Sequence, residues 1–143
     1  MLANSKLSWY LRRGLEHEMS AIQYYTTQFN LCKIWGLESA ASKFEEEAKE
    51  EFEHASRLIN FMLELGLTAS ATQLKPIPKT KTLKEILIVD WHLEKEVIEL
   101  YKDASVFCQK QGLLEAYELF YTLLQEEISH LNSIEKWITK LNK

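Results

Sequence analysis

Residues that interrupt helices are scarce in this sequence. Its 143 residues include only 4 Gly and 2 Pro, and both prolines, Pro76 and Pro78, lie in one short stretch. Because glycine and proline end or kink helices, their scarcity favours long, uninterrupted helices. The length is enough for one compact domain with its own core, and we expect a single domain over residues 1–143.

Other absences narrow the class of protein. The 2 cysteines, Cys32 and Cys108, form no CxxC or other metal-binding spacing, so we expect structural thiols in a reduced, cytoplasmic protein. No apolar run approaches the roughly 20 residues that span a bilayer, and the N-terminal segment lacks the continuous apolar region of a secretory signal. The net charge of −4 without a basic block gives no indication of binding to nucleic acid or to anionic membranes.

Apolar residues recur at spacings of three or four, which predicts four amphipathic helices and an all-α fold. The predicted helices span, approximately, residues 5–33, 39–65, 82–111 and 113–141. Gly36, Gly66 and Gly112 are placed to end the first three helices. Thr82, with Glu85 three residues later, predicts a capping box at the start of the third.

The longest break in the helical pattern is residues 66–81, which contain both prolines. A connection between antiparallel helices needs only a few residues, whereas this one is long enough to run the length of a bundle. We therefore predict a four-helix bundle with one long crossover, in which the second and third helices are parallel. Each half of the chain is then one helical hairpin, and a weak internal repeat with approximate two-fold symmetry follows.

One pattern of potential metal ligands occurs twice: a glutamate, followed 33 positions later by Glu-x-x-His. The six residues are Glu18, Glu51 and His54 in the first half, and Glu94, Glu127 and His130 in the second. Residues three apart lie on one face of a helix, and the first glutamate of each set interrupts an otherwise apolar stripe. One glutamate from each of two helices, with Glu-x-x-His from the other two, is the pattern of carboxylate-bridged dinuclear sites in four-helix bundles.

The charge of these residues indicates which ions they suit. Buried carboxylates without partners would destabilise the core, and metal ions would remove that cost. Four carboxylates balance two divalent cations, and two neutral imidazoles complete the ligand set. Carboxylate and imidazole without thiolate suit iron or manganese, and zinc also fits. We therefore predict two metal ions at one level of the bundle, with redox chemistry on O2 or peroxide if coordination positions stay open.

Other polar residues near the ligands have two interpretations. Tyr25 and Tyr101 either pack in the core or donate hydrogen bonds or electrons beside the metals. Asp90, on the same face of the third helix as a ligand, is a candidate hydrogen-bond partner for a ligating histidine. His17 and His92 point about 100° away from the ligand faces, so we expect neither to be a ligand.

Several motifs resemble those of bacterioferritins over nearly the whole chain. They are Glu18-x-x-Ala21-Ile22-x-x-Tyr25, Trp35-Gly36-Leu37, Glu51-x-x-His54-Ala55 and Leu65-Gly66-Leu67, together with Glu94 and Glu127-x-x-His130. The six ligands alone are shared with other di-iron carboxylate proteins. The motif of the first helix and the glycine turn therefore carry the more specific likeness.

The resemblance implies a ferroxidase centre with two iron ions per chain. Each iron would have a terminal glutamate and a histidine from one half of the chain, while Glu51 and Glu127 would bridge the two irons. Tyr25 would take part in electron transfer. The implied reaction is oxidation of two Fe(II) by O2 or H2O2, followed by mineral storage in a homo-oligomeric shell of 24 subunits.

Two departures from the family pattern bear on cofactors and partners. Bacterioferritins bind haem through a methionine directly after the first glutamate of the helix-two motif, and Phe52 stands at that position. Phenylalanine cannot coordinate iron, so we expect no haem bound in the family manner, although a mixed shell with a haem-binding subunit stays open. The chain also stops 13 residues after His130, without the family's short fifth helix, which leaves shell assembly open. Glu46 and Glu50 either bind iron in transit or belong to a solvated face.

These observations favour a haem-free ferroxidase that serves iron storage or detoxification, with two alternatives. The missing fifth helix suggests a di-iron or di-manganese oxidase or peroxidase that acts on a small substrate and forms no cage. The third hypothesis is a structural bundle without a redox metal. In that case, replacing Glu18 or Glu94 by alanine would not weaken Fe(II) binding.

Overall fold

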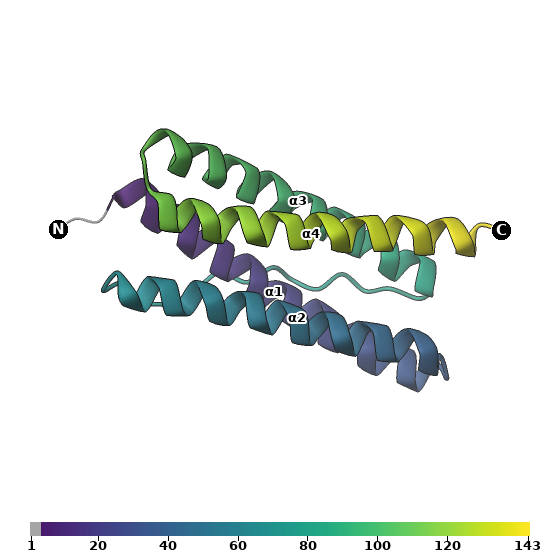
Figure 1. Ribbon diagram of the computed structural model, residues 1–143. Helices are drawn as coiled ribbons and strands as arrows, with labels where there is room; N and C mark the ends of the chain where they lie inside the picture. Colours follow the sequence, from purple (N-terminus) through teal and green to yellow (C-terminus); the bar gives the residue numbers. More distant parts are fainter. Residues whose placement is uncertain (1–3) are drawn as a thin grey trace.

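The computed structural model describes residues 4–143, and four long helices account for most of them (Figure 1). The helices are α1 (Ser5–Ile34), α2 (Glu38–Glu64), α3 (Leu83–Lys110) and α4 (Leu114–Leu141). Their ends agree with the predicted ends to within one residue, and the described part of the chain contains no strand. The prediction of an all-α, ferritin-like four-helix bundle is confirmed. None of the described helices is both long and apolar enough to cross a membrane.

The four helices form two antiparallel hairpins joined by a crossover. α1 packs mainly against α2, and α3 packs mainly against α4. The connection over residues 66–82 runs along the length of the bundle (Figure 1), so α2 and α3 are parallel, as predicted. Two hydrogen bonds of 2.9 Å attach it to α1. The Tyr24 hydroxyl donates to the Pro76 carbonyl oxygen, and the Lys75 N–H donates to the Ser20 hydroxyl.

Both hairpins turn at a glycine in the left-handed region. At the end of α1, Gly36 has a φ of 78°, and the N–H of Leu37 donates to the carbonyl oxygen of Cys32 over 2.8 Å. α3 ends with the same arrangement at Gly112, whose φ is 70°. Because side chains with a Cβ rarely adopt this conformation, glycine allows the last carbonyl groups of each helix to be capped. The predicted helix ends at these glycines are confirmed.

The start of α3 agrees with the prediction in part. The Thr82 hydroxyl accepts a hydrogen bond of 3.1 Å from the N–H of Glu85, as in a capping box. The Glu85 carboxylate accepts from the N–H of Lys81 over 2.9 Å rather than from Thr82. The reciprocal bond is therefore displaced by one residue.

The two hairpins repeat each other at an offset of 76 residues, more closely than the sequence alone suggested. The buried pairs related by this offset are Glu18/Glu94, Tyr25/Tyr101, Cys32/Cys108, Phe44/Phe120, Glu51/Glu127 and His54/His130. The two cysteines are free thiols buried in the core, as expected.

The apolar core lies in two clusters, one on each side of the predicted ligands. Leu11, Leu58 and Leu123 belong to one cluster, and Phe44 and Ile86 belong to the other. The glutamates and histidines therefore lie between two apolar layers of the core, where a charge without a partner has the largest desolvation cost.

Candidate metal centre

The structure brings the six predicted ligands together in two overlapping groups. Glu18, Glu51, His54 and Glu127 form the first group, and Glu51, Glu94, Glu127 and His130 form the second. Within each group, one potential ligand atom from every residue lies within 4.8 Å of the others. Glu51 and Glu127 belong to both groups, so the geometry is that of two adjacent positions that share two carboxylates. We call them the first and second metal positions.

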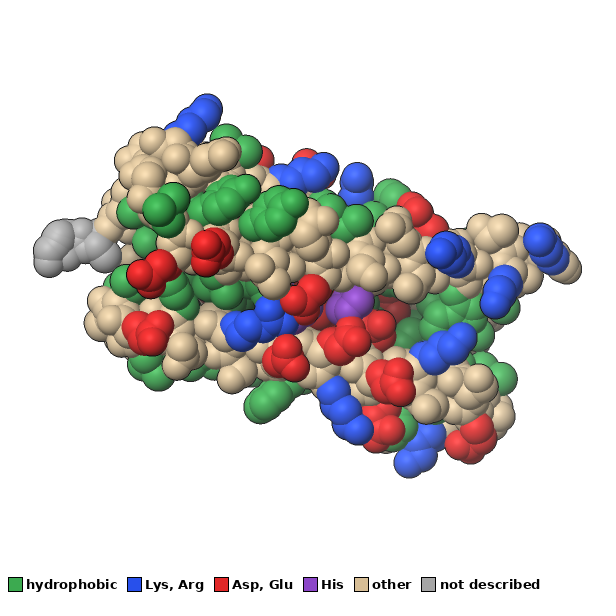
Figure 2. Space-filling view, in the orientation of Figure 1, with side chains coloured by type: hydrophobic (Ala, Val, Ile, Leu, Met, Phe, Trp, Pro, Cys, Tyr) green, Lys and Arg blue, Asp and Glu red, His purple; other side chains and the backbone are tan. Residues whose placement is uncertain are grey.

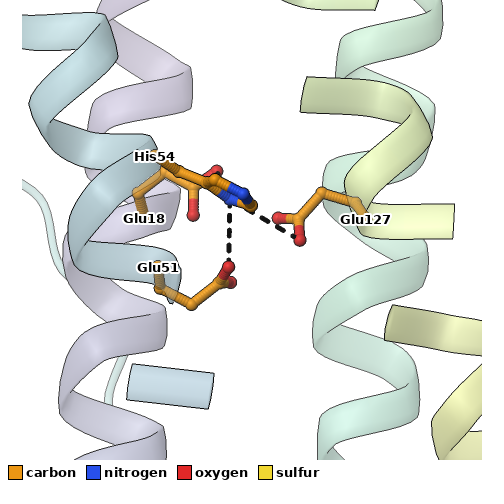
Figure 3. Close-up of side chains that lie close together, drawn as sticks. All are labelled: Glu18, Glu51, His54 and Glu127. Atoms are coloured by element: carbon orange, nitrogen blue, oxygen red, sulfur yellow. Dashed lines mark ion pairs between the residues drawn. The ribbon is translucent and has the colours of Figure 1, made fainter. Parts of the chain in front are cut away.

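At the first position, one ring nitrogen of His54 faces three carboxylates (Figure 3). Its Nδ1 lies 3.0 Å from Glu51, 3.5 Å from Glu18 and 3.8 Å from Glu127. These side chains come from α1, α2 and α4 and point toward one another. The other ring nitrogen, Nε2, lies 2.9 Å from a carboxylate oxygen of Glu126. A carboxylate on the far nitrogen orients the ring of a metal-ligating histidine.

The second position repeats this arrangement. The Nδ1 of His130 lies 3.0 Å from Glu127 and 3.1 Å from Glu94. Its Nε2 pairs with Glu50. Glu47 also lies 3.3 Å from Nδ1. Each histidine therefore directs one nitrogen toward the shared carboxylates and the other toward a glutamate of the opposite hairpin.

These two outer glutamates are functional candidates whose pairing with the histidines sequence reasoning missed. Glu50 and Glu126 are related by the 76-residue offset, and each directly precedes a ligand glutamate. That repetition was a usable signal. The prediction that Asp90 is the partner of a histidine is wrong: its carboxylate accepts a hydrogen bond of 2.6 Å from Gln28.

The four ligand glutamates are fully buried, and this burial governs their charge. Burial and the nearby Glu127 carboxylate raise the pKa of Glu18 to about 7. The same two causes raise the pKa of Glu51 and of Glu94 well above the ordinary value. Burial alone would also raise the pKa of Glu127, but the nearby imidazoles of His130 and His54 lower it overall. Without metal, protons therefore neutralise much of the cluster.

The polar atoms at the centre fit a pair of divalent cations. Several buried ligand atoms have no hydrogen-bond partner in the described part of the chain. They are one oxygen of Glu18, one of Glu94, both oxygens of Glu51 and Glu127, and Nδ1 of His54. Buried polar atoms in folded proteins are rarely left without a partner. Cations at the two positions would satisfy these atoms and replace the protons.

The two candidate tyrosines differ in their hydrogen bonding, and the two other histidines lie outside the ligand groups. Tyr25 is buried, and its hydroxyl has no hydrogen-bond partner among residues 4–143. Burial raises its pKa well above the ordinary value, and the nearby Glu94 carboxylate adds to the shift. Tyr101 instead donates a hydrogen bond to a ligand glutamate. As expected, His17 and His92 belong to neither ligand group. Burial lowers the pKa of His17 to about 4.

Comparison with known proteins identifies relatives over nearly the whole chain. The family model for the ferritin-like domain matches residues 10–143. The chain is 30% identical to a bacterioferritin of Rhodobacter capsulatus over 139 residues, which cover 97% of this chain and 86% of that relative. It is 31% identical to a bacterial ferritin of a Synechocystis species over 134 residues, which cover 93% and 86%.

A solved structure gives the same result for the fold. The R. capsulatus bacterioferritin superposes with a TM-score of 0.95 at 29% identity, covering 99% of this chain and 89% of that one. That protein is described as having a metal-free dinuclear site and a haem iron. From the matched domain, these identities and the superposition, we conclude that the chain belongs to the ferritin-like family and, within it, to the bacterioferritins.

Proposed function

We propose that this chain is a ferroxidase that oxidises Fe(II) at a carboxylate-bridged dinuclear centre and serves iron storage or detoxification. The observation that carries the proposal is the sharing of Glu51 and Glu127 between two buried groups of ligands. Two irons held by the same carboxylates are close enough to deliver two electrons to one oxidant. The dinuclear site described for the R. capsulatus relative supports this assignment.

The proposed reaction takes one electron from each of two Fe(II) ions. With O2 as the oxidant, the two electrons and two protons form H2O2, and with H2O2 they form two molecules of water. Glu18 and His54 would complete the first position, and Glu94 and His130 the second. The donor set also suits manganese or zinc, so iron is assigned through the family.

We assign Tyr25 to electron transfer at this centre. It would give one electron and its hydroxyl proton to the oxidant, and the neutral tyrosyl radical would recover an electron from a further Fe(II) and a proton from solvent. Its hydroxyl is buried among the carboxylates, and no described residue holds it. A tyrosine with a free hydroxyl beside the second position can contact the oxidant directly.

We further propose that the chain binds no haem through position 52. Phe52 is 66% exposed on α2, and its side chain has no lone pair to donate. The resemblance to bacterioferritins supports a homo-oligomeric shell. A mixed shell with a haem-binding subunit is the alternative, and size together with subunit composition distinguishes the two.

The test is an anaerobic Fe(II) titration followed by stopped-flow oxygenation, with the particle sized by light scattering. Fast formation of ferric absorbance that saturates at two irons per chain, in a particle of several hundred kilodaltons, is the expected result. The same oxidation in a small oligomer would favour an enzyme without a cage. Absence of stoichiometric Fe(II) binding would contradict the proposal and leave a structural bundle.

A further inference from the structure

One ligand of the first metal position is held by a tyrosine from the opposite hairpin. The hydroxyl of Tyr101, on α3, donates a hydrogen bond of 2.6 Å to Oε2 of Glu18, on α1. Both side chains are fully buried. Oε1 of Glu18 has no partner within residues 4–143. Oε2 is also the oxygen of Glu18 that lies 3.5 Å from Nδ1 of His54. The bond from Tyr101 therefore fixes the orientation of the carboxylate at the first metal position.

A glycine provides the space for this tyrosine. Gly14 lies one turn before Glu18 inside α1, where glycine destabilises a helix relative to alanine. A Cβ atom at this position would lie 3.2 Å from Cε1 of Tyr101 and 3.4 Å from its hydroxyl oxygen. The first of these contacts is tighter than ordinary packing. A side chain at Gly14 would therefore push the ring by a few tenths of an ångström from the position in which it bonds Glu18.

The described residues of the other hairpin form no equivalent hydrogen bond, although the equivalent tyrosine is present. At the offset of 76 residues, Tyr25 corresponds to Tyr101, and Asp90 corresponds to Gly14. The Tyr25 hydroxyl has no hydrogen-bond partner in the described chain. Asp90 occupies the space that a glycine would leave and binds Gln28 instead. The arrangement around Glu18 is therefore not a simple consequence of the repeat.

We propose that Tyr101, given space by Gly14, is a positioning residue that fixes the Glu18 carboxylate at the first metal position. The hydrogen bond removes the rotational freedom that Glu18 would otherwise lose on binding an ion. A preorganised ligand binds more tightly because that cost is already met in the folded protein. The inference rests on the proposed dinuclear centre and makes its first position the tighter of the two.

Calorimetric titration with Zn(II) tests this proposal without any turnover. Tyr101→Phe keeps the ring and removes the hydroxyl, and Gly14→Ala keeps the hydroxyl and displaces it. Both variants should lower the affinity for the first Zn(II) by about 10-fold or more, as the loss of residues that orient metal ligands does. Titration with Co(II) should show an altered visible absorption band at the first equivalent, because the geometry of the Glu18 ligand changes.

Tyr10→Phe is the matched control, since Tyr10 is buried in the same apolar cluster but makes no bond to a ligand. Its first Zn(II) should bind with the wild-type affinity. An unchanged affinity and an unchanged Co(II) spectrum in Tyr101→Phe would overturn the positioning role while leaving the dinuclear centre intact. An equal loss in Tyr10→Phe would also overturn it, because general packing would then explain the effect. Failure of the wild-type protein to bind Zn(II), Co(II) or Fe(II) would instead refute the centre itself.

Discussion

The glutamate that pairs with His54 is held by an arginine although its side chain is 42% exposed, whereas the equivalent glutamate beside His130 is more exposed and has no arginine at the repeat position. Glu126, the partner of His54, receives hydrogen bonds of 2.7 and 3.1 Å from Arg57. These bonds hold the pKa of Glu126 below its ordinary value. Glu50, the partner of His130, has a side chain that is 55% exposed. Ser133 stands where the 76-residue offset would place a second arginine.

His130, a candidate ligand of the second metal position, reaches the surface. It lines a cavity of about 270 Å³ together with Glu50, Glu53, Glu126 and Ser129. Figure 2 shows a histidine among acidic side chains in the seam between α2 and α4. Clustered carboxylates at an opening raise the local concentration of cations. We therefore expect an ion at the second position to exchange with solution more readily than an ion at the first.

Removing a shared carboxylate should give the largest effect, because it damages both positions at once. Glu51→Ala is expected to lower the rate of Fe(II) oxidation by more than about 100-fold, beyond the usual effect of losing an outer partner of a ligand. The measurement is stopped-flow oxygenation, with helix content checked by circular dichroism. Glu45→Ala, an exposed glutamate on the same helix, is the control and should oxidise Fe(II) normally. A wild-type rate in Glu51→Ala would contradict the dinuclear assignment.

The stability of the metal-free protein should fall as the pH rises from 6 to 8. The pKa of Glu18 is raised to about 7, and those of Glu51 and Glu94 are raised further, by burial first and by neighbouring carboxylates second. The nearby carboxylates outweigh burial and raise the pKa of His54 and His130. In this range the native protein keeps protons that the unfolded chain has released, so the free energy of unfolding decreases with pH. For each proton that the native protein keeps and the unfolded chain releases, the free energy of unfolding falls by about 1.4 kcal/mol per pH unit.

Urea denaturation at pH 6 and pH 8, with a chelator present, measures this loss. His17 acts in the opposite direction, because its pKa is lowered to about 4, but its contribution changes mainly between pH 4 and 6.5 and lies largely outside the tested range. Saturating Zn(II) should reverse the trend, since the bound ion displaces the protons and binds better at higher pH. A metal-free protein that becomes more stable at pH 8 would contradict the assigned protonation.

Removing the arginine that holds Glu126, at the first metal position, should have an intermediate effect on metal binding. In Arg57→Met, Glu126 loses its two hydrogen bonds, and the ring of His54 is less firmly oriented. We expect the affinity for the first Zn(II) to fall by about 10-fold and the affinity for the second to change little. Arg13→Met, which removes a surface ion pair with Glu16, is the control for charge loss. Equal weakening at both positions would show that the two are not supported separately.

The helices could be predicted from spacing within each helix. The grouping of the six candidate ligands could be predicted from that spacing together with the short turns of the two hairpins. Two copies of Glu-x-x-His, with the same preceding glutamate, place their side chains on one face whatever the packing of the bundle. The outer contacts could not be predicted in the same way. Arg57 with Glu126, and Tyr101 with Glu18, join residues of different hairpins, and their distances depend on how the helices pack. The spacing of residues along one helix contains no information on contacts between the two hairpins.

Asp90 and Gly14 are two positions whose contacts with other helices could not be predicted from spacing along one helix. Asp90 was a candidate partner for a histidine because it lies on a ligand face, but its carboxylate accepts a hydrogen bond from Gln28 on α1 instead. Gly14 gave no signal in the sequence, because an isolated glycine in a helix does not say which ring needs the space. Gly14 and Asp90 occupy equivalent positions in the two hairpins. Comparing the hairpins therefore shows where the surroundings of the two tyrosines differ.

Adding an arginine near Glu50, at the second metal position, should give the smallest effect on metal binding. Ser133→Arg places a guanidinium where the repeat of Arg57 would lie, within reach of Glu50. An exposed ion pair contributes at most about 1 kcal/mol, so we expect the affinity for the second Zn(II) to rise by about threefold and its dissociation to slow in proportion. Calorimetry measures the affinity, and chelator-induced release followed over time measures the dissociation. Ser133→Lys, which brings the charge without the two-pronged geometry, should gain less. If lysine and arginine gain equally, charge alone distinguishes the two positions; if arginine alone gains, the held geometry of the outer glutamate makes the first position tighter.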